Sequence, residues 1–242
     1  MSAVQADLRA RGFVGLRVVG DVHGDATAFE HAAAGAEATG LFLLQLGDLT
    51  DHGPDSPAVL RRIFGLLDSG RGRFLLGNHD HKLRRALLGQ RVRMAAEGLG
   101  RTLAQLAAAP DGPALTARAV AEIALAPAWL RLDTWLFVHG GWHTRMLREP
   151  SPPQAGAQKP DPLLSRALFG QVTGRMMADG YPERLHDWVD RIPPGFTLYC
   201  GHERRATDGR PFVQPGEAGG RAVFLDTGAG KGGHLSWIDL AF

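Results

Sequence analysis

A series of short apolar runs, most of which stop at a glycine, restricts the fold more than any other sequence feature. Each run has the length of a β-strand and is rich in Val, Leu or Phe. Helical patterns separate the early runs, over residues 25–38 and 56–69. This alternation predicts an α/β fold. The runs are "LRVVGDV", "LFLLQLG", "RFLLGN", "WLRLDTWLFVHG", "FTLYCGH", "AVFLDTG" and "HLSWIDL".

Local signals predict where the helices begin. Asp25 is expected to cap the first helix, and Ser56 is expected to cap the second, with Pro57 at its first helical position. Residues 80–127 predict a helical insertion that is interrupted at "PDGP". We expect residues 1–242 to form one domain that carries this insertion.

A proline-rich stretch follows the fourth apolar run. Residues 148–162, "REPSPPQAGAQKPDP", have no apolar period and predict a surface loop. Such a loop could serve as a spacer or as an active-site lid.

Charge and cysteine usage narrow the functional classes. The net charge of +2 and the absence of any block of like charges predict no stable nucleic-acid partner. Cys200 is the single cysteine, which excludes an intrachain disulfide and a thiolate-rich zinc site. The chain has no run of 18 apolar residues, and its opening lacks the apolar centre of a secretory signal. We therefore expect a cytoplasmic protein, and its oligomeric state stays open.

Asp, His or Asn follows six of the strand-like segments, flanked by glycine. Ligands of open α/β sheets bind beyond the carboxyl ends of the strands, so these groups can converge. Asp21 and His23 lie two positions apart, which places both side chains on the same side of an extended chain. The six motifs are "GDVHG" (20–24), "GDLTDHG" (47–53), "GNHD" (77–80), "HGG" (139–141), "GH" (201–202) and "DTG" (226–228).

The chemistry of these side chains indicates a metal site. Oxygen and imidazole donors without thiolate suit manganese, iron, nickel or zinc better than calcium or copper(I). Six candidate ligands exceed the number that one tetrahedral ion needs, which suggests two metals bridged by a shared carboxylate. The candidates are Asp21, His23, Asp48, Asn78, His139 and His202.

The ordered series "GDVHG", "GDLTDHGP", "GNHD", "HGG" and "GH" resembles the PPP-type, calcineurin-like metallophosphoesterases. Two further stretches, "GNHDHKLRRALLGQRV" and "GLGRTLAQLA", are similar to the phosphatase module of bacterial polynucleotide kinase-phosphatase. The chain also resembles Bacillus-type asymmetric diadenosine tetraphosphate hydrolases. The resemblance implies a four-layer sandwich in which helices flank two central β-sheets.

The same resemblance implies a role for each motif residue. Asp21, His23 and Asp48 would bind one metal, with Asp48 bridging to a second metal that Asn78, His139 and His202 complete. The two ions are expected to be manganese, with iron, nickel or zinc as alternatives. His79 would be the general acid, oriented by Asp51, and Asp226 would lie at the edge of the site.

The implied reaction is in-line attack of a metal-bridging hydroxide on a phosphate ester. Phosphate monoesters, including phosphoprotein, are the expected substrates. Dinucleoside polyphosphate hydrolysis and RNA-end phosphatase or phosphodiesterase activity are the alternatives. A degenerate relative that binds phosphate ligands without turnover is the non-enzymatic alternative.

His52 departs from the pattern of the resembled families, which have Arg at this position. Imidazole lacks the permanent charge and planar fork with which Arg binds phosphate. His52 is therefore either a weakened phosphate contact or a residue that hydrogen-bonds within its loop. Arg84, Arg85, Arg145, Arg204 and Arg205 are candidates to replace the missing cation.

Two other motifs point to chemistry less strongly. "GAGKGG" at 228–233 satisfies a dinucleotide-binding pattern, but a strand-like segment follows it, so it predicts a hairpin turn. Cys200 ends an apolar run and is expected to be a small buried hydrophobe.

Overall fold

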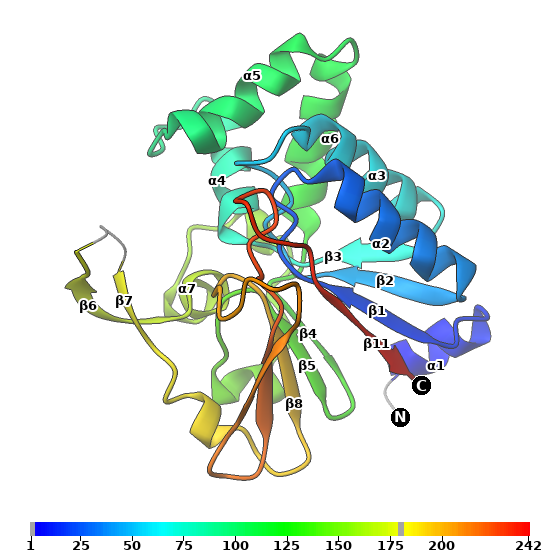
Figure 1. The fold of residues 1–242 in the computed structure, drawn as a ribbon, viewed down its shortest axis with the longest axis vertical. Coiled ribbons are helices and arrows are strands. Elements are labelled where there is room, and N and C mark those ends of the chain that lie inside the picture. The colour runs from blue at the N-terminus through cyan, green and yellow to red at the C-terminus, as the bar shows by residue number, and fades with distance from the viewer. Residues whose placement is uncertain (1–2, 179–181) are drawn as a thin grey trace.

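The computed structural model describes residues 3–178 and 182–242, which form two β-sheets, a separate hairpin and their covering helices (Figure 1). The first sheet has the order β11-β1-β2-β3, from Trp237–Ala241, Gly15–Val19, Leu41–Gln45 and Gly72–Phe74. The second has the order β4-β5-β8-β10-β9, from Trp129–Leu132, Trp135–Val138, Thr197–Cys200, Arg221–Phe224 and Phe212–Pro215. The hairpin pairs β6 (Gln171–Met176) with β7 (Pro182–Leu185).

Helices surround the sheets and also form the helical insertion that was predicted between β3 and β4. The α-helices are α1 (Ala3–Ala10), α2 (Ala26–Ala38), α3 (Ser56–Asp68), α4 (Asn78–Leu87), α5 (Arg101–Ala108), α6 (Gly112–Leu125) and α7 (Pro162–Phe169). One π-helical turn, η1 (Ala96–Gly100), precedes α5, and short 3-10 turns cover Thr144–Leu147, Ala155–Ala157 and Val189–Arg191. The predicted interruption at "PDGP" is confirmed, because α5 ends before it and α6 begins inside it.

The two sheets pack face to face, and this contact creates the inner core. Leu16 and Val18 of β1 belong to the same buried cluster as Phe137 of β5 and Tyr199 of β8. The opposite faces of both sheets join a larger cluster with α2, α3 and α7. Helix, sheet, sheet and helix therefore form the expected four layers.

Strand direction places the candidate residues together. β1, β2 and β3 are parallel to one another in the first sheet, and β5, β8 and β10 are parallel in the second. In each sheet the carboxyl ends of these three strands lie at one edge. The six predicted motifs follow these six strands.

The two predicted helix starts have different outcomes. Asp25 caps α2 as predicted, because its carboxylate accepts a hydrogen bond from the backbone N–H of Ala28. The prediction for α3 was wrong by one residue. Asp55 is the cap and accepts from the backbone N–H of Ala58, so Ser56 is the first helical residue. Asp is as good a cap as Ser, and the sequence "DSP" offers both.

The glycine-rich segment 228–233 forms a turn, as predicted, because the backbone N–H of Gly233 donates to the carbonyl of Gly228 and that of His234 to the carbonyl of Thr227. The turn does not, however, join two strands of one sheet. The strands on its two sides, β10 and β11, belong to different sheets. The segment is therefore a crossing between the sheets, and it passes over the strand ends that carry the motifs (Figure 1).

The proline-rich stretch 148–162 is anchored to the helical segment. Gly156 is buried, and a Cβ atom there would lie 1.8 Å from the backbone oxygen of Ile123 in α6. The carbonyl of Gln158 lies 3.0 Å from Nε2 of His81 in α4. Within residues 3–178 and 182–242, no helix has the length and apolar character that a membrane span requires.

Candidate metal centre

The six predicted ligands converge between the two sheets. Nε2 of His23 lies 3.7 Å from a carboxylate oxygen of Asp21 and 3.7 Å from one of Asp48. Nε2 of His139 lies 3.4 Å from the other oxygen of Asp48 and 2.9 Å from Oδ1 of Asn78. Asp48 is therefore placed between two groups of donors, Asp21 with His23 and Asn78 with His139.

Three overlapping sets have the geometry of a metal site, and two of them share Asp48; the third is His23, His52 and His79. Asp21, His23 and Asp48 each offer one ligand atom, and these atoms lie within 4.8 Å of one another. Asp48, His139 and His202 form a second set by the same measure. The shared carboxylate is the arrangement that a bridged pair of ions requires.

Left-handed backbone conformations are concentrated at the site. Positive φ angles occur at His23 (46°), Asp48 (61°), Asp51 (78°), His52 (61°) and His202 (63°). Only a few per cent of residues other than Gly adopt this region, with Asn, Asp and His enriched there, and such conformations cluster at functional sites. The fold therefore holds these side chains in place at a conformational cost.

Asp80 stabilises the backbone beneath the site, although the sequence analysis did not select it. Its buried carboxylate accepts hydrogen bonds from the backbone N–H groups of Asp48, Leu49 and Gly77, at 2.8–3.0 Å. Burial and the Asp48 charge raise the pKa of Asp80 to about 6. Its position in "GNHD" was the available signal.

His79 and Asp51 form the predicted pair at 2.5 Å, between Nδ1 and a carboxylate oxygen. Lys82, one helical turn after His79, places its ammonium 2.9 Å from the same oxygen. Burial opposes ionisation of Asp51, but the hydrogen bond and charge of His79, together with Lys82, lower its pKa to about 2. Asp51 is thus a carboxylate at neutral pH.

Helix α5 holds the Asp51 loop from behind. Thr102 Oγ1 donates to the second oxygen of Asp51 at 3.0 Å and accepts from the Asp51 backbone N–H at 3.0 Å. Gln105 donates to the carbonyls of Gly53 and Pro54, at 3.2 and 2.7 Å. The helical segment therefore fixes the "GDLTDHG" loop.

The two central carboxylates have opposite electrostatic environments. Burial and the neighbouring Asp226 and Asp48 raise the pKa of Asp21 well above its usual range. Burial also opposes ionisation of Asp48, but the imidazoles of His139 and His79 lower its pKa well below that range. Despite its burial, Asp48 and Asp21 raise the pKa of His139 to about 9. The carboxyl and imidazole groups therefore shift one another's pKa values at the point where cations would bind.

Two cations from late in the chain face the site, and neither was a sequence candidate. Nζ of Lys231, in segment 228–233, lies 2.7 Å from Nε2 of His23. A guanidinium nitrogen of Arg184, in β7, lies 2.5 Å from Nε2 of His202. Both residues line a cavity of about 460 Å³ that also contains Asp226 and Arg204.

His52 lies beside the site but contributes no permanent charge. Its ring centroid is 5.0 Å from that of His23 and 5.4 Å from that of His79. Burial, Lys231 and His79 lower the pKa of His52 to about 4. The side chain is therefore neutral at pH 7, and Arg101 binds only its backbone carbonyl.

Most of the arginines that could supply the cation missing at His52 lie away from the metal centre. Arg145 pairs with Glu149, and Arg205 stacks over Phe212. Arg84 and Arg85 line a different cavity, whereas Arg204 lines the cavity beside His202.

Asp226 follows β10, and Cys200 is the last residue of β8. Asp226 accepts from the Gly228 backbone N–H at 2.9 Å and raises the pKa of Asp21, so it lies at the edge of the site. Cys200 is fully buried, as expected.

The sequence pattern of the calcineurin-like phosphoesterases matches residues 16–203. The chain belongs to this family and is a metal-dependent phosphoric ester hydrolase.

Its relatives include proteins named asymmetrical bis(5'-nucleosyl)-tetraphosphatase PrpE. The protein from Geobacillus thermodenitrificans is 29% identical over 195 residues, which cover 79% of this chain and 72% of the relative. The protein from Halalkalibacterium halodurans is 28% identical over 233 residues, which cover 90% and 87%.

Solved structures support the same fold. A crystal structure of a candidate diadenosine tetraphosphatase has a TM-score of 0.57 at 20% identity and covers 95% of both chains. A protein serine/threonine phosphatase from Saccharomyces cerevisiae has a TM-score of 0.55 at 14% identity and covers 96% of this chain and 81% of its own. At such identities the likeness concerns the fold alone.

Proposed function

We propose that this chain hydrolyses dinucleoside polyphosphates with two divalent cations at the centre around Asp48. The observation that carries this proposal is the similarity to relatives named tetraphosphatases over up to 90% of the chain. The cavity beside His202, which Lys231 and Arg204 line, offers cations to phosphate groups. The sequence-based preference for phosphate monoesters or phosphoprotein becomes the second candidate.

The donor set fits two hard or borderline divalent ions. Asp21, His23 and Asp48 would hold one ion, and Asp48, Asn78, His139 and His202 would hold the other. Carboxylate, amide oxygen and imidazole donors suit manganese, with iron, nickel and zinc as alternatives. When bound, such ions neutralise phosphate charge and make a water nucleophile available at neutral pH.

His79 is placed to give a proton to the leaving oxygen. Its Nδ1 lies 2.5 Å from a carboxylate oxygen of ionised Asp51, which fixes the orientation of the imidazole. Nε2 is directed to the Asp48 side, 3.9 Å from that carboxylate. The pair therefore supplies a general acid beside the reacting phosphate.

Lys231, Arg184 and Arg204 are placed to bind phosphate oxygens. Each carries a permanent charge at neutral pH, in contrast to His52. Three carboxylates, from Glu183, Glu203 and Asp226, line the same cavity, and Glu203 pairs with Arg184 at 3.2 Å. Lys231 and Arg204 are therefore the cations with the most freedom to bind phosphate oxygens. The preference for a polyphosphate over a monoester therefore rests on the named relatives.

A competition assay on the metal-loaded enzyme tests this choice. Diadenosine tetraphosphate, p-nitrophenyl phosphate, a phosphoserine peptide and an RNA 2′,3′-cyclic phosphate end would be compared at one manganese concentration. We expect the highest kcat/KM for diadenosine tetraphosphate. A higher kcat/KM for the phosphopeptide would favour the second candidate. Bound metal without turnover of any substrate would indicate a binding protein.

A further inference from the structure

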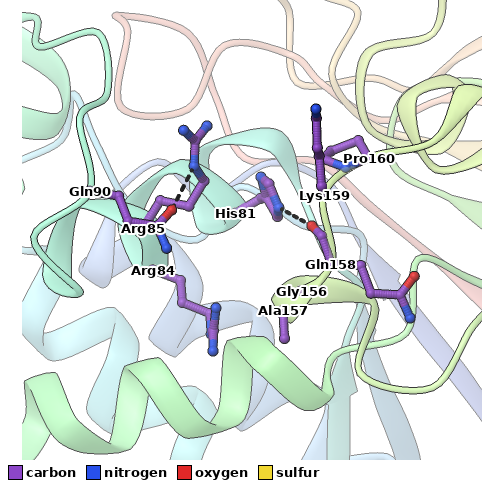
Figure 2. Close-up of a pocket in the computed structure, with 9 residues that line it drawn as sticks. All are labelled: His81, Arg84, Arg85, Gln90, Gly156, Ala157, Gln158, Lys159 and Pro160. Atoms are coloured by element: carbon purple, nitrogen blue, oxygen red, sulfur yellow. Dashed lines mark hydrogen bonds between the residues drawn. The ribbon is translucent and has the colours of Figure 1, made fainter.

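A second cavity, of about 480 Å³, lies between α4 and residues 156–160 (Figure 2). Side chains of α4 form one wall, and the backbone of residues 156–160 forms the other. Figure 2 shows Arg85 and Lys159 extending to the same side of the cavity, with His81 between them and Arg84 pointing toward α6. We call it the α4 pocket.

The α4 pocket is lined by positive charge without a negative partner. Arg84, Arg85 and Lys159 all line it, and no Asp or Glu is among its lining residues in the described part of the chain. Within residues 3–178 and 182–242, none of these three cations forms an ion pair with a carboxylate. Other arginines of this chain do pair, such as Arg61 with Asp111 and Arg118 with Asp68. No carboxylate of the described residues therefore competes with an anionic ligand for these three cations.

The walls of the α4 pocket are fixed in place. The carbonyl of Gln158 accepts from Nε2 of buried His81, which joins the two walls. Arg84 donates from Nε to the carbonyl of Val120, and Arg85 donates from Nε to the side chain of Gln90. One terminal nitrogen of Arg85 also donates to the carbonyl of Arg91 at 3.3 Å. The other terminal nitrogens of the two guanidinium groups remain available to an anion. A prearranged set of cations loses less entropy on binding than a flexible one.

The helix connects this pocket to the metal centre. Asn78, His81 and Arg85 are spaced i, i+3 and i+7, so they lie along one face of α4. At 1.5 Å per residue, the axial distance from Asn78 to Arg85 is about 10 Å. The phosphate groups of one extended ligand can span a distance of this order.

We propose that the α4 pocket is a second phosphate-binding site, which takes phosphate groups of a nucleotide or polyphosphate through Arg84, Arg85 and Lys159. Guanidinium and ammonium groups bind phosphate oxygens with charge-assisted hydrogen bonds. The phosphates belong either to the far end of a substrate at the metal centre or to a separate nucleotide. The first source, a substrate that also reaches the metal centre, rests on the proposed function. The second source, a separate nucleotide, does not.

Kinetics of the metal-loaded enzyme test the first source. The variants are Arg85→Gln with Lys159→Gln, and Ala157→Phe, which fills the pocket without changing charge. Arg148→Gln, at an exposed position outside the pocket, is the matched control. We expect KM for diadenosine tetraphosphate to rise roughly tenfold in both pocket variants. Turnover of p-nitrophenyl phosphate should stay within about twofold, because a small ester reaches only the metal centre.

Calorimetric titration with inorganic tripolyphosphate tests the pocket itself. We expect a binding event in the metal-loaded wild type and in Arg148→Gln that is weakened about tenfold in both pocket variants. If this weakening occurs while KM for the dinucleotide is unchanged, the phosphates belong to a separate ligand. Identical titrations and identical KM values in pocket variants and control would overturn the proposal. Failure of the wild type to hydrolyse diadenosine tetraphosphate would instead count against the proposed function.

Discussion

Lys231 and His23 are 208 residues apart in sequence, yet Nζ of the lysine lies 2.7 Å from Nε2 of the histidine. Nε2 of His23 is also the atom that would bind a metal ion. An ammonium group cannot share that lone pair with a cation, so metal binding would move Nζ away from His23. The cavity beside His202 is the space available to it, and phosphate oxygens would occupy that space.

Lys231→Gln is expected to weaken substrate binding. Loss of a charge-assisted contact to phosphate should raise KM for diadenosine tetraphosphate roughly tenfold, with a smaller change in kcat. Lys231→Arg should keep most of the affinity, because it restores the cation. Steady-state kinetics with Arg148→Gln as the control would measure the effect. A KM that is unchanged in Lys231→Gln would exclude the contact.

The metal centre was predictable because its residues follow strands, and strand ends are readable from sequence. Glycines beside Asp21, Asp48 and His139 marked each end. Lys231 was not predictable in the same way. Its segment resembles a hairpin locally, and only the pairing of β11 with β1 carries it across to His23.

The residues outside the motifs that hold the site in place could not be identified from the sequence either. Thr102 and Gln105 lie in a helix that the periodicity predicted, but their contacts to the Asp51 loop are tertiary. Arg184 lies in β7, whose pairing with β6 has no strong apolar alternation. Such residues are placed by packing between distant segments rather than by local pattern.

His52→Arg is expected to increase turnover of p-nitrophenyl phosphate at pH 8. The imidazole, with its pKa lowered to about 4, is neutral at this pH, whereas Arg carries a permanent charge beside His23 and His79. Because Lys231 already supplies one cation, we expect a gain of only about two- to fivefold in kcat/KM. His143→Arg, at an exposed position, is the control. A lower or unchanged value would leave His52 as a residue of the loop without a phosphate contact.

Asp48→Asn is expected to reduce metal content from two ions per chain to one or none. Asp48 faces both donor groups, with one oxygen toward His23 and the other toward His139. An amide has one acceptor oxygen and no charge, so it cannot bridge two cations as a carboxylate does. Elemental analysis after manganese loading and desalting would measure the loss. Retention of two ions in the variant would contradict the bridging role, and Asp133→Asn, at the exposed β4–β5 turn, is the control.

Thr102→Val tests whether the helical segment positions the general acid. The substitution keeps the shape but removes the hydroxyl that donates to Asp51 and accepts from its backbone N–H. We expect kcat to fall roughly tenfold with metal content unchanged, because only the orientation of the Asp51 and His79 pair is disturbed. Thr116→Val, in α6, is the matched control. A parallel loss of metal would show that Thr102 supports the whole loop rather than the pair.

Asp51 is expected to make the free energy of unfolding depend on pH. Its pKa is about 2 in the folded protein and 3.8 in the unfolded chain, so ionised Asp51 stabilises the fold by about 2 kcal/mol. That stabilisation is fully present at a pH above the pKa of Asp51 in the unfolded chain. It is lost as the pH falls through the pKa of Asp51 in the folded protein. Denaturant unfolding of the metal-free protein at pH 5 and pH 3 would measure it. Asp51→Asn should lose less stability between these two pH values than the wild type does, because it has no carboxylate to protonate. An equal loss in both proteins would show that other carboxylates determine the acid sensitivity.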